Sequence, residues 1–357
     1  MPSSVRSARG IPRQGDSRGV CSDSRFGAKP HGSATRQGSP VMDDDAREPA
    51  LWPALNDTGW RETLTTFQLW TQIVGKVRLA LTPWLNHGWQ VPLYVTARGL
   101  GTSAVHAGAL IFEVEFDLVD HKLRVRSPDA AEDSLALEPM SVATFYRRFM
   151  AMLDKIGVRV TIDTMPNEVP QPVRFTEDEV HFAYDAAAVN AFWRVLVQCD
   201  RLFKLFRTGF VGKASPVHFF WGGLDLAVTR FSGRPAPLHP GGIPGLPDRV
   251  TREAYSHEVS SAGFWPGNER FPRAAFYSYA YPTPQGFDRA AVEPQEAVWS
   301  AELGEWLLPY AAVRTARDPD AQVLRFLQST YRAAADLGGW DRDLECGLGI
   351  PGLPRGL

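Results

Sequence analysis

Apolar positions along the chain follow a helical period in some segments and a strand period in others. Helical spacing predicts four helices, at 58–82, 140–156, 186–208 and 319–337. Thr58 is expected to cap the first helix and Pro83 to end it. For the last helix, Asp318 and Pro319 indicate the beginning and Gly338-Gly339 the end.

Alternation with a period of two predicts strands in both halves of the chain. The expected strands are 91–97, 109–118, 122–126, 158–163, 216–221, 224–231, 252–262, 274–281, 296–300 and 305–309. Gly222-Gly223 predicts a tight hairpin turn, and the Pro- and Gly-rich residues 232–250 predict a long loop. The pattern therefore indicates an α+β fold, with antiparallel sheets covered by long amphipathic helices.

A shared spacing in the two halves indicates an internal duplication. Trp70, Ile73, Val74, Arg78 and Leu79 are spaced as Trp193, Leu196, Val197, Arg201 and Leu202. A strand that begins near a proline follows each set. We therefore expect two related helix–strands–helix halves, at 49–175 and 176–345. The alternative, that two amphipathic helices share this spacing by chance, stays open.

Both ends of the chain differ from the part between them. Residues 1–48 are rich in Ser, Gly, Pro and Arg and carry almost no aliphatic side chains. Such a composition buries too little apolar surface to offset the entropy of ordering, so we expect a disordered segment. Residues 346–357 are expected to form a flexible tail. A true start at Met42 is as compatible with the pattern as one at Met1.

Composition and charge argue against several classes of protein. The 357 residues include 38 Lys plus Arg and 40 Asp plus Glu, a net charge of -2, which gives no overall field for nucleic acid. No run approaches about 18 apolar residues, so no membrane span is expected. Cys21, Cys199 and Cys346 are too few for a disulfide framework or a zinc site. We expect a cytoplasmic protein without nucleic-acid or membrane partners.

Glu113, Glu115 and Asp117 lie on one face of the strand 109–118. With Asp120-His121 as the turn, Asp117 is expected opposite Arg124 and Glu115 opposite Arg126. Opposite charges across a sheet stabilise it by roughly 0.2–1 kcal/mol per pair. Ion pairing, rather than metal binding, is therefore the expected role of this face.

The hairpin at 216–231 predicts one apolar and one more polar face. The apolar face consists of Val217, Phe219, Trp221, Leu224, Leu226 and Val228. On the other face, His218 and Asp225 are diagonal neighbours, about 7–8 Å apart between backbones. A carboxylate there favours a charged or oriented imidazole, as general acid–base catalysis requires. The alternative is a histidine packed under a helix with satisfied nitrogens.

A second group of polar residues lies in the segment 255–261. On a strand, Tyr255 and His257 share one face, and Glu258 lies on the other. Both histidines are expected to converge on a ligand. Two histidines with scattered carboxylates are a weak metal signal, so no metal is assigned. The sequence has no Gly-X-Ser-X-Gly elbow, dinucleotide fingerprint or P-loop, and no cofactor is identified.

Arg78 and Arg201 occupy equivalent positions on the two helices related by the proposed duplication. Each lies one turn from apolar neighbours, so each is a candidate to bind a small anionic ligand through a carboxylate or phosphate. The alternative is a buried stem with its charged end in water.

Four segments resemble an uncharacterised bacterial family that is described only as a domain of unknown function. They are 69–79 (LWTQIVGKVRL), 92–100 (PLYVTARGL), 215–222 (SPVHFFWG) and 255–258 (YSHE). The resemblance covers roughly residues 50–345. It implies no activity, cofactor or catalytic residue.

The sequence by itself does not define a function. Ionisable residues on otherwise apolar strands favour a small-molecule-binding protein or enzyme, with a pocket near His218, Asp225, His257 and Glu258. Tyr255, Arg78 and Arg201 are the candidate ligand-binding residues. The alternative is a structural or protein-interaction module in which these groups satisfy one another. The oligomeric state is not indicated.

Overall fold

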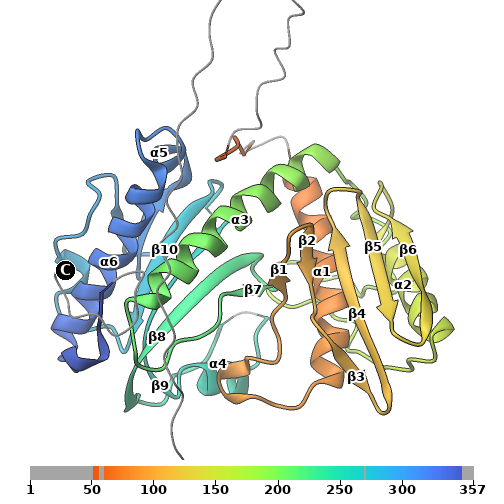
Figure 1. Ribbon diagram of the computed structural model, residues 1–357, viewed down its shortest axis with the longest axis horizontal. Helices are drawn as coiled ribbons and strands as arrows, with labels where there is room; N and C mark the ends of the chain where they lie inside the picture. The colour runs from red at the N-terminus through yellow and green to blue at the C-terminus, as the bar shows by residue number, and fades with distance from the viewer. Residues whose placement is uncertain (1–50, 56–59, 244, 269–270, 348–357) are drawn as a thin grey trace, which may run out of the picture. The chain divides into compact units, whose positions relative to one another are not determined.

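Two antiparallel sheets and six α-helices make up the described part of the chain in a computed structural model (Figure 1). The structure describes residues 51–55, 60–243, 245–268 and 271–347. These elements confirm the α+β class. The expected disordered segment 1–48 and the expected cap Thr58 lie outside the described residues, as does most of the tail 346–357.

The first sheet is formed by residues 94–136. Its strands are β1 (Tyr94–Val95), β2 (Gly99–Gly101), β3 (Val105–Ala107), β4 (Leu110–Asp117), β5 (Lys122–Ser127) and β6 (Ala130–Ala136). The spatial order is β1-β2-β4-β5-β6, and β3 pairs with β4. Apolar residues of β4 and β5 at alternate positions, such as Val114 and Val125, are buried, as the sequence pattern predicts.

The second sheet is formed by residues 218–309. Its strands are β7 (His218–Phe220), β8 (Asp225–Pro235), β9 (His257–Trp265), β10 (Ala275–Tyr281), β11 (Val298–Ser300) and β12 (Glu305–Pro309), in the order β11-β12-β10-β9-β8-β7. The expected hairpin register is confirmed, because His218 pairs with Ala227 and Phe219 with Leu226. The edges of the two sheets meet where Leu93 and Phe219 exchange two backbone hydrogen bonds of 2.9 Å.

Most helices pack on these sheets. The α-helices are α1 (Arg61–Leu81), α2 (Val142–Lys155), α3 (Ala186–Thr208), α4 (Asp248–Ala254), α5 (Tyr310–Arg314) and α6 (Pro319–Leu337). Figure 1 shows α3 lying across β8 and α6 beside β10, in agreement with their contacts. Three short 3₁₀ helices are also described: η1 (Asn86–Gly88), η2 (Phe287–Arg289) and η3 (Arg342–Leu344). Helix α4 packs on η1. Within the described ranges, every helix is too short or too polar to cross a bilayer.

Helix α1 differs from the expected amphipathic helix, because every residue from Leu69 to Arg78 is buried. A helix buried on all sides must satisfy its polar side chains inside the protein. Gln72 exchanges two hydrogen bonds with the backbone of Asn167, at 2.9 and 2.8 Å. Lys76 donates to the carbonyl of Met165. The polar side of α1 therefore holds the irregular segment around residues 165–168.

Several segments differ from the sequence prediction. The expected strand 252–262 is wrong at its beginning, because α4 continues to Ala254 and β9 starts only at His257, so Tyr255 follows a helix and does not lie on a strand. Residues 158–163 form no strand, although Val158 and Ile162 are buried at alternating positions as a strand would require. The segment has no described strand partner, and alternation alone does not reveal a missing partner. The expected loop 232–250 is interrupted at both ends, because β8 extends to Pro235 and α4 begins at Asp248.

The turn between β4 and β5 contains four residues, Leu118–His121, instead of the expected two. Asp117 therefore lies opposite Lys122, and the expected register is wrong by two residues. The Asp117 carboxylate explains this, because it accepts hydrogen bonds from the backbone N–H groups of Val119 and Asp120 at 3.1 and 2.9 Å. Such side-chain-to-backbone bonds stabilise a longer turn.

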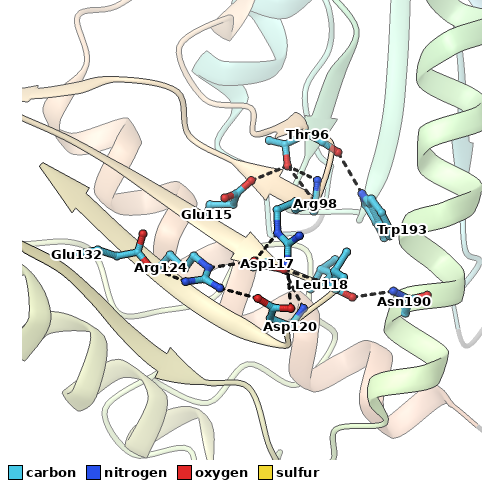
Figure 2. A network of polar contacts seen from close by, with 12 residues as sticks. Thr96, Arg98, Glu115, Asp117, Leu118, Asp120, Arg124, Glu132, Asn190 and Trp193 are labelled. Atoms are coloured by element: carbon cyan, nitrogen blue, oxygen red, sulfur yellow. Dashed lines mark hydrogen bonds and ion pairs between the residues drawn. The ribbon is translucent and has the colours of Figure 1, made fainter. Parts of the chain in front are cut away.

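The expected ion pairs nevertheless form, as diagonal contacts. Arg124 binds Asp117 at 2.9 Å and Arg126 binds Glu115 at 2.8 Å. Figure 2 shows that Arg98 also reaches the buried Asp117, at 2.7 Å. These hydrogen bonds hold the pKa of Asp117 far below its ordinary value, against the opposing effect of desolvation.

The same network reaches α3. Asn190 donates to the carbonyl of Leu118 at 2.8 Å, and Trp193 donates to that of Thr96 at 3.3 Å (Figure 2). The charged residues on β4 and β5 therefore have a structural role, as the sequence indicates, and they lie beside the contact between the first sheet and α3.

Candidate functional site

One face of the second sheet carries tyrosines and carboxylates at alternate positions. Ser261 of β9 pairs with Thr229 of β8 on one side and with Tyr279 of β10 on the other. Two residues further along β9, Gly263 pairs in the same way with Ala227 and Tyr277. Side chains two residues apart on a strand share a face, so Asp225 of β8 belongs to the same face. We call Glu168, Asp225, Tyr255, Tyr277, Tyr279 and Glu305 the tyrosine–carboxylate site.

Asp225 directly follows the hairpin turn at 221–224, where Leu224 adopts a φ of 55°. Its carboxylate accepts a hydrogen bond of 2.6 Å from the Tyr277 hydroxyl. Desolvation raises the pKa of Asp225 to about 6, although this hydrogen bond acts in the opposite direction. The residue is only half-buried. Asp225 is thus a partly accessible residue whose carboxylate holds or releases a proton near neutral pH.

Glu168 reaches the site from the segment held by α1. Its φ of 55° lies in the left-handed region, and the adjacent Asn167 is held by Gln72. A side chain on Gly222 would place its Cβ 2.0 Å from Oε1 of Glu168, so any larger residue there would displace the Glu168 carboxylate. Desolvation of the carboxylate, together with the charge of Asp225, raises the pKa of Glu168 to about 7, although the residue as a whole is exposed.

The remaining members come from β12, β10 and the residue after α4. Glu305 of β12 is half-buried, and desolvation with the charge of Asp225 raises its pKa to about 7. The hydroxyls of Tyr255 and Tyr279 lie 2.8 Å apart, and desolvation raises the pKa of Tyr279 to about 12. The site therefore combines three carboxylates that resist ionisation with phenols that stay protonated.

His218 lies on the same face as Asp225, but it does not form the expected contact with that carboxylate. It is 1% exposed, and its Nε2 has no hydrogen-bond partner among the described residues. The rings of Trp89, Tyr94 and Phe220 surround it at 5.7 to 6.0 Å. Desolvation, with Arg78 and Arg207 nearby, lowers its pKa to about 3. The expected contact between His218 and Asp225 is therefore not formed among the described residues, and Asp225 bonds Tyr277 instead.

His257 and Glu258, the second expected pair, are consecutive residues of β9 and so lie on opposite faces of the sheet. His257 is half-buried, with Nδ1 3.2 Å from the Ser256 hydroxyl and its ring 5.6 Å from that of His87. Glu258 pairs with Arg234 at 2.6 Å and lines a cavity of about 110 Å³ with Trp340. Two intervening rings, Trp89 and His87, connect His218 to His257.

The two candidate arginines have different environments. Arg78 is buried and donates to the carbonyls of Gln90 and Thr102, and desolvation lowers its pKa. Arg201 is 48% exposed and pairs with Asp320 at 2.6 Å. Both guanidinium groups are therefore engaged by the protein.

Of the seven predicted residues, the structure brings Asp225 and Tyr255 into one site. Sequence reasoning missed Glu168, Glu305, Tyr277 and Tyr279. The two tyrosines had a usable signal, because residues 275–281 (AFYSYAY) place tyrosine at every second position of a strand. Glu168 lies in an irregular segment and had none. In the described ranges, no three His, Cys, Asp or Glu residues are placed to hold a metal ion.

Fold and site together define an α+β protein with two antiparallel sheets and a cluster of tyrosines and carboxylates on the second. The chain belongs to a family of unknown function, DUF5996, whose model matches residues 52–346. This confirms the resemblance seen in the sequence. No curated protein and no solved structure matches the chain.

Proposed function

We propose that the tyrosine–carboxylate site binds a small polar molecule with hydroxyl or amino groups, and that Asp225 exchanges a proton with it. The observation that carries this proposal is Asp225 itself. The residue is half-buried, and its carboxylate lies 2.6 Å from a phenol and has a pKa of about 6. A group of this kind is populated in both protonation states near pH 7, as a general acid or base requires.

The charge of the site favours this class of ligand over the small anion expected from the sequence. Glu168 and Glu305 are close enough to Asp225 for its charge to raise their pKa values, so an anion is repelled. Arg78 and Arg201, the candidate anion ligands, already have protein partners. His218, His257 and Glu258 stay predicted members of a wider site.

A structural or protein-interaction module is the second candidate. Its support is that Tyr277 bonds Asp225, Tyr255 bonds Tyr279, and the Thr229 and Ser261 hydroxyls lie 2.9 Å apart. In this alternative the polar groups only satisfy one another. The partial exposure of Asp225, Tyr255, Tyr279 and Glu305 favours ligand binding over it.

Thermal shift measurements test the two candidates. The panel contains amines, sugars, nucleosides, amino acids, carboxylates and metal ions, and the proteins are the wild type, Asp225→Asn and the exposed control Glu302→Gln. We expect a hydroxyl- or amino-bearing compound to raise the Tm of the wild type and the control but not of Asp225→Asn. A His218→Ala/His257→Ala variant asks whether the imidazoles contribute.

No shift with any compound, or a shift that survives Asp225→Asn, contradicts the proposal and favours the structural candidate. Stabilisation by carboxylates alone would restore the anion hypothesis.

We also propose that the halves 49–175 and 176–345 arose by duplication. In each, a long helix precedes a six-stranded sheet and a further helix follows it, α2 in the first half and α6 in the second, although the second half also contains the short helices α4 and α5. Leu93, just before the first strand of one half, and Phe219, in the first strand of the other half, form two backbone hydrogen bonds with each other. Superposition of residues 60–160 on 185–337 tests this proposal, and failure of equivalent helices and strands to align rejects it.

A further inference from the structure

A second cluster of titratable groups surrounds Lys213, apart from the tyrosine–carboxylate site. Nζ of Lys213 lies 2.5 Å from Nε2 of His87. Phe231, whose ring Lys213 contacts, is on the same strand as Asp225 but six positions further along, about 20 Å away. The cluster therefore needs an account of its own.

The hydrogen bonds of His87 define its tautomer. Nδ1 lies 3.3 Å from the carbonyl oxygen of Ala254, so Nδ1 carries the proton, and Nε2 presents its lone pair to Lys213. His87 is buried, and its φ of 59° is held by a hydrogen bond of 3.2 Å from its backbone N–H to Glu253. Lys213 is thus placed next to a fixed proton acceptor.

The surroundings of the amino group are largely aromatic. Nζ lies 5.3 Å from the ring centre of Trp89 and 4.9 Å from that of Phe231. Desolvation lowers the pKa of Lys213, against the charge of Glu253, and it also lowers the pKa of His87, as do the charges of Lys213 and His257. Lys213 is nevertheless exposed, so its amino group is open to small molecules in solution.

We propose that Lys213 is a reactive amine that forms an imine with small aldehydes, with His87 as the group that accepts and returns the proton. The ammonium proton passes to Nε2 of His87, and the nitrogen lone pair then forms a bond to the carbonyl carbon. Proton transfer from nitrogen to oxygen gives the carbinolamine. His87 protonates its hydroxyl group, which leaves as water, and a protonated imine remains.

Lys204 and Lys122 provide matched comparisons within the chain. Lys204 is exposed and pairs with Asp200 at 2.6 Å, which favours its charged form. Lys122 is exposed on β5. Neither has a described histidine acceptor, so both report the reactivity of ordinary surface lysines.

Reductive alkylation tests the proposal on the full chain at pH 7. Propanal supplies the aldehyde, cyanoborohydride supplies the hydride that traps the imine, and peptide mass spectrometry follows each lysine with time. We expect Lys213 to be alkylated several-fold faster than Lys122, because His87 takes up the proton of its amino group. In His87→Asn, which keeps a residue type tolerated at positive φ, its rate should fall to that of Lys122.

An equal or slower rate at Lys213 in the wild type overturns the proposal, whether or not the variant folds. An unchanged Lys213 rate in a folded His87→Asn variant removes the role of His87. The Lys122 and Lys204 rates in the same samples show whether a variant has unfolded, and Lys213→Arg must remove the fast-modified peptide. The result does not depend on the Asp225 site.

Discussion

Three carboxylates in the tyrosine–carboxylate site destabilise the folded state when they are ionised, because their pKa values are raised. Glu305 shows how this effect depends on pH. Its folded pKa of about 7 lies above the ordinary value of 4.5, so the folded protein binds more protons between these pH values. The associated stability is complete below pH 4.5 and is lost as the pH rises through 7. Charged groups that reduce stability are typical of functional sites.

We therefore expect Glu305→Gln, which is neutral at every pH, to raise the free energy of unfolding at pH 8 by about 1–2 kcal/mol, a value reduced for partial solvent exposure. At pH 4.5 the gain should disappear. Urea unfolding at the two pH values measures it, with the exposed Glu302→Gln as the control. A gain of equal size at both pH values would show that the charge is not its cause.

The pKa of His218 is lowered in the folded protein, whereas that of Glu305 is raised. The two groups therefore have opposite effects on the pH dependence of stability. The folded pKa of His218, about 3, lies below the ordinary 6.5, so the unfolded chain binds the extra proton. Stability from the neutral imidazole is complete above pH 6.5 and is lost as the pH falls toward 3. We expect a loss of about 2 kcal/mol between pH 7 and pH 5 that is absent in His218→Phe.

Urea titrations of both proteins at pH 7 and pH 5 provide the measurement. The exposed His106 offers the matched control, His106→Phe, which should keep the acid sensitivity of the wild type. If His218→Phe loses as much stability as the wild type, the buried imidazole is not the acid-sensitive group.

Between elements, the Asp117 network connects a turn, two strands and a loop. The carboxylate is fully buried and receives Arg98, Arg124 and two backbone N–H groups (Figure 2). Asn190 and Trp193 of α3 join the network by donating hydrogen bonds to the carbonyls of Leu118 and Thr96. A buried carboxylate with this many donors positions elements as well as stabilising them.

Removal of the charge should therefore be costly. We expect Asp117→Asn to lower the free energy of unfolding by about 3 kcal/mol at pH 7, because an amide cannot replace the carboxylate for two arginines. The exposed pair of Arg147 and Glu179, at 3.5 Å, provides the control: Glu179→Gln should change stability by less than about 0.5 kcal/mol. Equal effects in urea unfolding would remove the distinction between buried and surface pairs.

At the scale of the whole molecule, α1 connects the two sheets. Its Phe67 packs edge-on against Phe116 of the first sheet with ring centres 5.5 Å apart. A Cβ on its Gly75 would lie 2.1 Å from Nε1 of Trp221, so the hairpin of the second sheet packs directly on the helix backbone. The hydrogen bonds between Leu93 and Phe219 add a direct connection.

This shared helix predicts cooperative unfolding. We expect far-UV circular dichroism and tryptophan fluorescence to give the same urea midpoint, because neither sheet keeps its core once α1 leaves. Two separate midpoints would indicate that the proposed halves, 49–175 and 176–345, are independent folding units.

Local periodicity by itself determined much of the fold. The expected helices 186–208 and 319–337 coincide with α3 and α6, and 140–156 contains α2. The hairpin register around Gly222 is also local, because a short connection leaves few pairings. Asp225 was recognisable as a polar residue on an apolar strand, and Tyr255 as part of the polar segment 255–261.

Tertiary structure decided what depends on distant partners. The Asp117 carboxylate determines the turn at 118–121, because it binds the backbone of that turn. Residues 158–163 alternate like a strand but form none, because no described strand lies beside them to pair with. Glu168 and Glu305 join Asp225 only because α1 holds one segment and β12 pairs with β10. Such convergence of residues far apart in the sequence has no periodic signal, since it arises from packing between elements.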